Sequence, residues 1–233
     1  MNDFNLTAIL MNAEYGAMLI KGVKLTLLVA LCSWTLAMTL ALMLLTLRLT
    51  SLAWAQKLVA GYVAYHRNVP TLVQLMLWYF GISSLLPDAL QTWLSLHNAE
   101  AVFAIIALGL CQAAYFSEDL RSGLRAIPSG QSEAARALGH SYLGSMRHVI
   151  MPQAIRNAMP SLVNHSVSLF KNSSLAMAIG VAELTHAVKE IESQSFRAFE
   201  SYFVATILYL FLSLIIMSAG AWLTKRLSIS GAR

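Results

Sequence analysis

Charged residues are scarce in this chain. Of its 233 residues only 12% are Asp, Glu, Lys or Arg, against about 25% in soluble globular domains. Hydrophobic residues make up 58%, and the mean hydropathy is +0.63. Residues 25–47 and 201–224 contain no charged residue. A helix needs about 20 such residues to cross the hydrocarbon core. The composition therefore favours membrane spans over helices buried in a soluble core.

Metal-ligand and nucleic-acid signals are also missing. The two cysteines, Cys32 and Cys111, both lie in apolar runs without metal-ligand spacing, so we interpret them as small core residues. The six histidines show no zinc spacing, and His140 and His148 are expected to be ordinary loop residues. The net charge of +5 is not arranged as a basic stripe with aromatics between. We expect no metal in this chain and no nucleic-acid partner.

Catalytic motifs are absent from the sequence as well. It contains no Gly-x-x-x-x-Gly-Lys-Ser/Thr loop, which would cradle ATP phosphates. It contains neither His-Glu-x-x-His nor Gly-x-Ser-x-Gly. We therefore expect a non-catalytic membrane subunit with no cofactor of its own.

The order of apolar and polar segments predicts an all-α, polytopic membrane protein with five spanning helices. Residues 1–22 are expected to form an outer interfacial segment, 23–225 the transmembrane domain, and 226–233 a tail. Polar residues interrupt the second and fourth spans, and a Glu- and Ser-rich connection precedes the fifth. The predicted spans are about 23–47, from 58 to before 87, about 101–116, about 149–181 and 201–224.

The distribution of Lys and Arg predicts the orientation. With the N-terminus outside, the inner loops and ends hold eleven of these residues and the outer ones hold three. Cytoplasmic loops carry the excess of positive charge in membrane proteins. We therefore expect the N-terminus outside, the C-terminus in the cytoplasm, and the polar segment 119–148 in the cytoplasm.

That polar segment carries the most informative pattern. Its alanines favour a helix, expected over about 130–148, with Ser132 as N-cap and Glu133 in the first turn. Gly139 then allows a turn that a side chain would strain. Such a helix has little to bury, so we interpret it as a docking site for a soluble partner. The alternative is an ordinary amphipathic loop.

The spacing around this helix resembles the "EAA" signature of ABC-transporter permeases: Glu-Ala-Ala, three residues, Gly, nine residues, Ile-x-Leu-Pro. Here Val149 and Met151 replace the Ile and the Leu. Four further stretches resemble elements of permeases for polar amino acids, and the likeness covers roughly residues 20–225. These stretches are residues 67–74, 114–123, Pro160-x-x-x-Asn164 and 171–175.

The resemblance implies a type I importer-like permease in a bacterial inner membrane. It implies a separate ATPase dimer, which binds ATP and Mg, and a second permease subunit, identical or paralogous. A periplasmic or lipid-anchored solute-binding protein would deliver the amino acid. The expected ATPase-coupling residues are Gly130, Gln131, Glu133, Ala134, Ala135 and Gly139. A small channel or scaffold subunit of an unrelated membrane complex is the alternative.

The fourth span carries an unusual polar stripe. Asn164, Ser168 and Lys171 are spaced i, i+4 and i+7 and so share a helix face. His165 and Asn172 lie on the adjacent face. A lysine at mid-membrane costs about 2.5–3.5 kcal/mol and normally faces a cavity or a partner group. We predict that these five residues bind a polar L-amino acid at the midplane, in a helix broken at Pro160. Alternatively, Lys171 snorkels outward and the stripe is structural.

Two further expectations concern charge. Many permeases of this kind carry an acid where His165 stands, so the resemblance disfavours a cationic substrate and mildly favours acidic ones such as glutamate and aspartate. Four polar residues lie near the cytoplasmic halves of their spans and either gate the permeation path or form structural pairs. These residues are Arg67, Gln74, Glu118 and Arg121.

Overall fold

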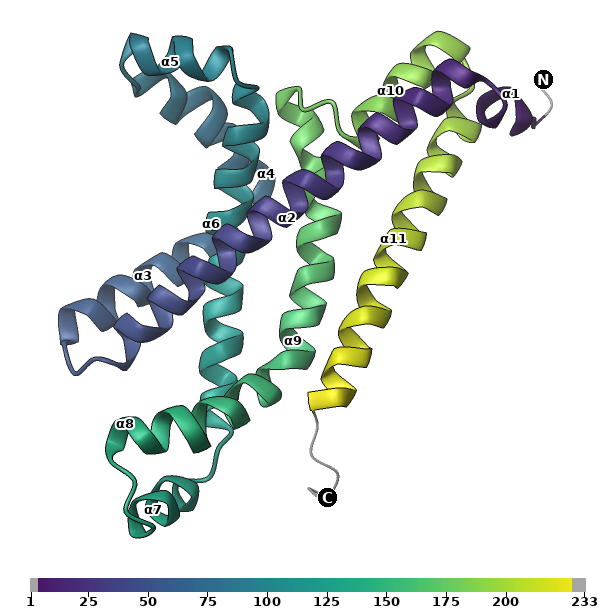
Figure 1. Ribbon diagram of the computed structural model, residues 1–233. Coiled ribbons are helices and arrows are strands. Elements are labelled where there is room, and N and C mark those ends of the chain that lie inside the picture. The colour runs from purple at the N-terminus through teal and green to yellow at the C-terminus, as the bar shows by residue number, and fades with distance from the viewer. Residues whose placement is uncertain (1–3, 228–233) are drawn as a thin grey trace.

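The computed structural model describes residues 4–227, and these contain helices and no strand (Figure 1). The predicted all-α class is confirmed. Among these described residues, three helices are long and apolar enough to cross a membrane by length and composition. They are α2 (Ala13–Leu49), α6 (Ala99–Arg125) and α11 (Ala198–Leu227). The other two predicted spans are each divided between several helices.

The second predicted span is divided at its expected polar interruption. Helix α3 (Ala53–Asn68) is followed by α4 (Thr71–Met76), a π-helical turn (Leu77–Ile82) and a 3-10 turn (Ser83–Leu85). Val69 is extended, as a residue before proline prefers. Gln74 braces the break, because its amide donates to the Val69 carbonyl at 2.8 Å and its oxygen lies 2.5 Å from His66 Nδ1.

The fourth predicted span is α9 (Met151–Asn172), which continues into the 3-10 helix η4 (Ser173–Ile179). The predicted break at Pro160 is wrong, since α9 runs through it. Pro160 lies on an exposed side, while Ala158 and Leu162 beside it are buried. Packing of that buried side holds the helix although the proline removes one backbone hydrogen bond.

The helix ends do not coincide with the ends of the predicted segments. Helix α2 begins at Ala13, where Asn12 accepts hydrogen bonds from the first-turn amides, so most of the segment 1–22 belongs to α2. Within residues 4–12, α1 (Thr7–Leu10) precedes it. Helix α10 (Leu184–Ser195) forms within the Glu- and Ser-rich connection, and α5 (Asp88–Ser95) lies between the second and third predicted spans. Of the expected tail 226–233, only the first two residues are described, and they end α11.

Helix α6 is the centre of the fold and packs against both α2 and α9 (Figure 1). Helix α11 lies along α9, and α10 joins α2 to α11. Small residues allow the close crossing of α6 and α9. A Cβ placed at Gly123 would lie 2.9 Å from the Cβ of Ala158 and would overlap the carbonyl oxygen of Ala154.

A buried carboxylate joins three helices at the opposite end of the molecule. Glu183 is fully buried and caps α10 by accepting from the His186 amide at 3.0 Å. Its other oxygen accepts from the Tyr209 hydroxyl of α11 at 2.7 Å and from the Thr26 hydroxyl of α2 at 3.3 Å. The carboxylate is therefore well satisfied despite its burial.

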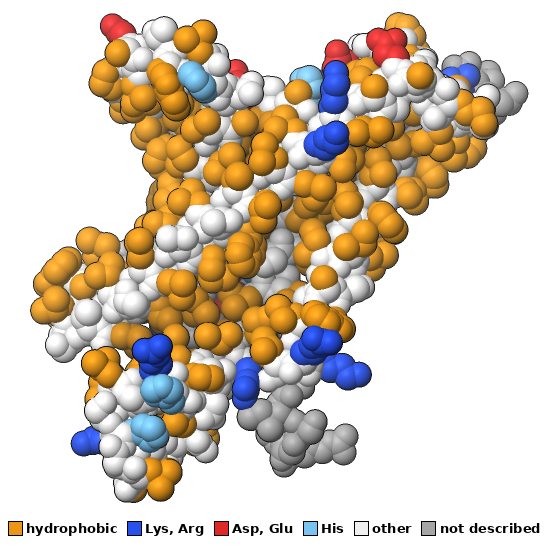
Figure 2. Space-filling model, in the orientation of Figure 1, with side chains coloured by type: hydrophobic (Ala, Val, Ile, Leu, Met, Phe, Trp, Pro, Cys, Tyr) orange, Lys and Arg blue, Asp and Glu red, His pale blue; other side chains and the backbone are white. Residues whose placement is uncertain are grey.

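Most of the acidic side chains seen in Figure 2 lie at one end of the molecule. Basic groups lie at the end that carries α7, α8 and the end of α11, and acidic groups lie over α5 and α10 at the other end, where basic groups lie beside them. Hydrophobic side chains cover the surface between them. This pattern agrees with an apolar belt between two polar ends.

Candidate functional site: the α7–α8 segment and a polar face of α9

The predicted coupling helix is present, but it is divided. It consists of α7 (Ser129–Ala137), α8 (Tyr142–Ser145) and the π-helical turn η3 (Met146–Ile150), rather than one helix over 130–148. Gly139 ends α7 in the left-handed region at φ 88°, so the predicted turn is confirmed. Because α7 starts after Pro128, Ser132 is not its cap and Glu133 is not in its first turn.

Most of the predicted coupling residues face outward. Gly130, Gln131, Glu133, Ala134 and Gly139 are exposed. The buried exception, Ala135, belongs to α7, which packs against η3. Three large apolar side chains beside these residues are also exposed, and such a patch marks an interaction surface. They are Leu138 (83%), Tyr142 (67%) and Leu143 (76%).

The polar stripe of α9 lies on a face that this chain covers only in part. Asn164 and Lys171 are exposed, whereas Ser168 and Asn172 are half-buried. Buried residues of the same helix, such as Ala158, face α6 instead. The polar residues thus lie along one side of α9, exposed at Asn164 and Lys171 and half-buried at Ser168 between them.

His165 is held by a partner that the sequence analysis missed. Its Nδ1 lies 2.6 Å from Asp119 Oδ2, and its ring centroid lies 5.1 Å from that of Tyr115. The Arg67 guanidinium lies over the Tyr115 ring, 5.5 Å from its centroid. Tyr115 and Asp119 are four residues apart on α6 and so share the face that meets α9. That four-residue spacing was the feature of the sequence from which their shared position could have been predicted.

Glu118, the residue before Asp119, pairs with arginines rather than with His165. It accepts from Arg48 at 2.8 Å and from Arg121 through two guanidinium nitrogens. Arg48 was not among the predicted site residues. This ion-paired group joins the ends of α2 and α6, and Gln74 braces the break between α3 and α4. Of the four predicted gating residues, Arg67 alone is linked to the polar residues of α9: it contacts Tyr115, whose ring lies beside that of His165.

Comparison with known proteins identifies the family. Residues 35–229 match the family described as "Binding-protein-dependent transport system inner membrane component". The chain belongs to this family. It is a multi-pass inner-membrane permease subunit of an ABC importer for amino acids.

Similar proteins include characterised and probable permeases. The permease is 34% identical to the probable amino-acid permease protein YxeN of Bacillus subtilis (strain 168), over 84% of this chain and 85% of that protein. It is 34% identical to the octopine transport system permease protein OccM of Rhizobium radiobacter, over 85% and 81%. It is 28% identical to the glutamate/aspartate import permease protein GltJ of Escherichia coli (strain K12), over 94% and 91%.

Solved structures support the fold. An amino acid ABC transporter crystallised with histidines matches with a TM-score of 0.82 and 29% identity, over 94% of the permease and 98% of that chain. The methionine transporter MetNI matches with a TM-score of 0.70 at 18% identity, over 94% and 100%, which supports the fold alone.

Proposed function

We propose that this permease imports polar L-amino acids, with acidic ones slightly favoured, and that ATP hydrolysis in a partner drives transport. The polar face of α9, exposed at Asn164 and Lys171, is the observation that carries the proposal. Its residues are Asn164, His165, Ser168, Lys171 and Asn172. The names of similar permeases include octopine and glutamate/aspartate transport, which supports a polar, charged class of substrate.

The preference for acidic substrates rests on Lys171. Its exposed ammonium group offers a carboxylate an opposite charge where little water screens it. The second argument for acidic substrates is that His165 stands where many similar permeases carry an acid. Asp119 weakens it, because its carboxylate lies beside His165 and supplies an acidic group at the same level of the membrane. The proposed site therefore holds groups of both signs, which suits a ligand with separated ammonium and carboxylate groups.

The partners follow from the exposed surfaces. We propose that an ATPase dimer, which binds ATP and Mg, docks on α7 and the apolar residues that follow it. A second permease subunit, a copy or a paralogue, would cover the polar face of α9 and complete the path. A solute-binding protein would deliver the amino acid at the end that carries α5 and α10. The permease itself would hold no cofactor.

The substrate proposal predicts the effect of Lys171→Met. Loss of the ammonium group should lower glutamate uptake roughly tenfold or more, the typical cost of a hydrogen bond to a charged group. Assembly with the ATPase and basal ATP hydrolysis should stay unchanged. Uptake of labelled amino acids into vesicles measures the first, and co-purification and phosphate release measure the others. Lys24→Met, an exposed lysine of α2, is the matched control.

Two results would contradict the substrate proposal. If Lys171→Met and Asn164→Ala both carry acidic, neutral and basic amino acids as the parent does, the stripe is structural. If the parent carries only a basic amino acid, the charge argument is wrong even though the site can be right.

The proposed orientation predicts one-sided labelling of α7. We propose that the N-terminus faces outside and α7 faces the cytoplasm, because of the bias in Lys and Arg. In a background without Cys32 and Cys111, a cysteine introduced by Ser132→Cys should react with an impermeant maleimide only after the cells are opened. Ser193→Cys, in the exposed part of α10, should react in spheroplasts. Labelling of Ser132→Cys in intact spheroplasts would overturn the orientation.

A further inference from the structure

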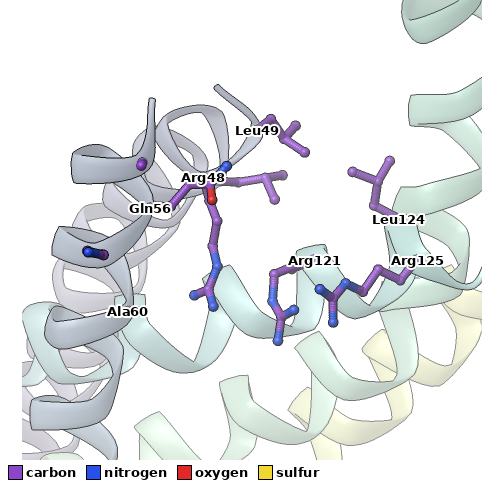
Figure 3. A pocket seen from close by; sticks show the side chains of 10 residues that line it. Arg48, Leu49, Gln56, Ala60, Arg121, Leu124 and Arg125 are labelled. Atoms are coloured by element: carbon purple, nitrogen blue, oxygen red, sulfur yellow. The ribbon is translucent and has the colours of Figure 1, made fainter. Parts of the chain in front are cut away.

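A basic pocket lies where α2 ends, α3 begins and α6 ends (Figure 3). It is a cavity of about 490 Å³, within the usual size of ligand pockets. In Figure 3 the side chains of Arg48 and Arg121 extend downward, and that of Arg125 extends sideways toward Arg121. Four cations line the pocket together with apolar and amide side chains. The lining residues are Arg48, Lys57, Arg121 and Arg125, with Leu45, Leu49, Ala53, Gln56, Ala60 and Leu124.

The positive charge of this pocket exceeds its internal compensation. Glu118 pairs with Arg48 and Arg121 and neutralises one of these two charges. Lys57 and Arg125 form no salt bridge within residues 4–227. The C-terminal ends of α2 and α6 contribute only partial negative charge. An anion in the pocket would therefore meet attraction from several sides.

The position of the pocket matches the boundary between membrane and water. It lies at the ends of two helices, α2 and α6, that are long enough to span a bilayer. The Trp54 side chain is 63% exposed next to the pocket residue Ala53, and tryptophan is enriched at this boundary. Leucines from α2 and α6 form an apolar wall beside the cations. The pocket thus offers one charged side and one apolar side.

We propose that this pocket binds the phosphate of an anionic phospholipid, of the phosphatidylglycerol type, in the leaflet on the side of α7. Basic pockets between membrane helices on the cytoplasmic side bind such headgroups. A free phosphate shares the anionic group but has no acyl chain to cover the leucines. No side chain caps the N-terminus of α3 at Ala53, so its amides add to the attraction.

The test uses the permease purified in complex with its partner subunits and a variant that leaves the Glu118 ion pairs intact. Native mass spectrometry would count bound lipids while phosphatidylglycerol or phosphatidylcholine is added. The parent should retain phosphatidylglycerol in preference to phosphatidylcholine. The double variant Lys57→Gln/Arg125→Gln should bind it roughly 30-fold more weakly, at about 1 kcal/mol per cation. The matched control, Lys21→Gln/Lys24→Gln, changes the same charge at the other end of α2 and should bind as the parent does.

A second variant tests the cavity without changing charge. Ala60→Leu adds bulk to the pocket wall and should also displace the lipid, which separates a shaped site from general attraction. Three results would overturn the proposal: equal retention of the two lipids, equal losses in the double variant and its control, or complete displacement by inorganic phosphate at millimolar concentration. The last result would assign the pocket to a soluble anion.

Discussion

Replacing Gly123 with leucine should prevent the permease from folding into a stable, monodisperse form. A Cβ alone at this position would overlap the Ala154 carbonyl and approach the Ala158 Cβ to 2.9 Å. Backbone cannot rotate away as a flexible side chain can, so α6 and α9 would have to separate. Overpacking of this kind costs about 1–3 kcal/mol, and the larger leucine should exceed that range. Thermal unfolding and size-exclusion profiles in detergent measure the effect.

Gly61 provides the matched control. It lies inside α3, and nothing comes within 4 Å of a Cβ built there. Gly61→Leu should therefore keep the parent profile, while Gly123→Ala should lie between the parent and Gly123→Leu. A Gly123→Leu protein with an unchanged unfolding temperature would show that the crossing of α6 and α9 is looser than described here.

Replacing Gly139 with valine should reduce transport roughly tenfold without unfolding the permease. The residue has φ 88°, a region that costs a β-branched side chain about 1–3 kcal/mol. The space around it is open, so the strain falls on the turn after α7 rather than on the core. The proposed ATPase surface should then be misplaced. Vesicle uptake and co-purification of the ATPase would measure the loss.

Asparagine separates backbone strain from loss of the glycine itself. It tolerates the left-handed region better than valine, so Gly139→Asn should retain most of the transport. Equal transport by the Val variant and the parent would sink the proposed coupling role of this turn. Equal loss in both variants would instead show that the missing Cβ matters for contact with the partner.

The long apolar runs and the turn residues were predictable because single local features determine them. Leu25 to Leu47 can only be a buried or lipid-facing helix, and Gly139 is one of few residues suited to φ 88°. The same local rule failed at Pro160, where packing of α9 against α6 outweighs the loss of one hydrogen bond. Helices α5 and α10 were missed because they are short and amphipathic rather than continuously apolar.

Pairings between distant residues could not be read from the sequence. His165 and Lys171 belong to the same predicted binding site, yet the structure holds the first against Asp119 and leaves the second exposed. Glu118 and Asp119 are neighbours, but a turn of about 100° per residue sends one toward Arg48 and the other toward His165. These outcomes depend on how α2, α6 and α9 are placed relative to each other.

The buried Glu183 also determines when, during synthesis, the helices can complete their packing. Its oxygens bond Thr26 on the first long helix and Tyr209 on the last, so partners separated by 183 positions along the chain meet at one carboxylate. Thr26 leaves the ribosome long before Tyr209 exists. Until then, Glu183 needs water or another donor, because a charge is costly to bury unpaired. The part of α2 around Thr26 therefore reaches its final packing only after α11 has been inserted.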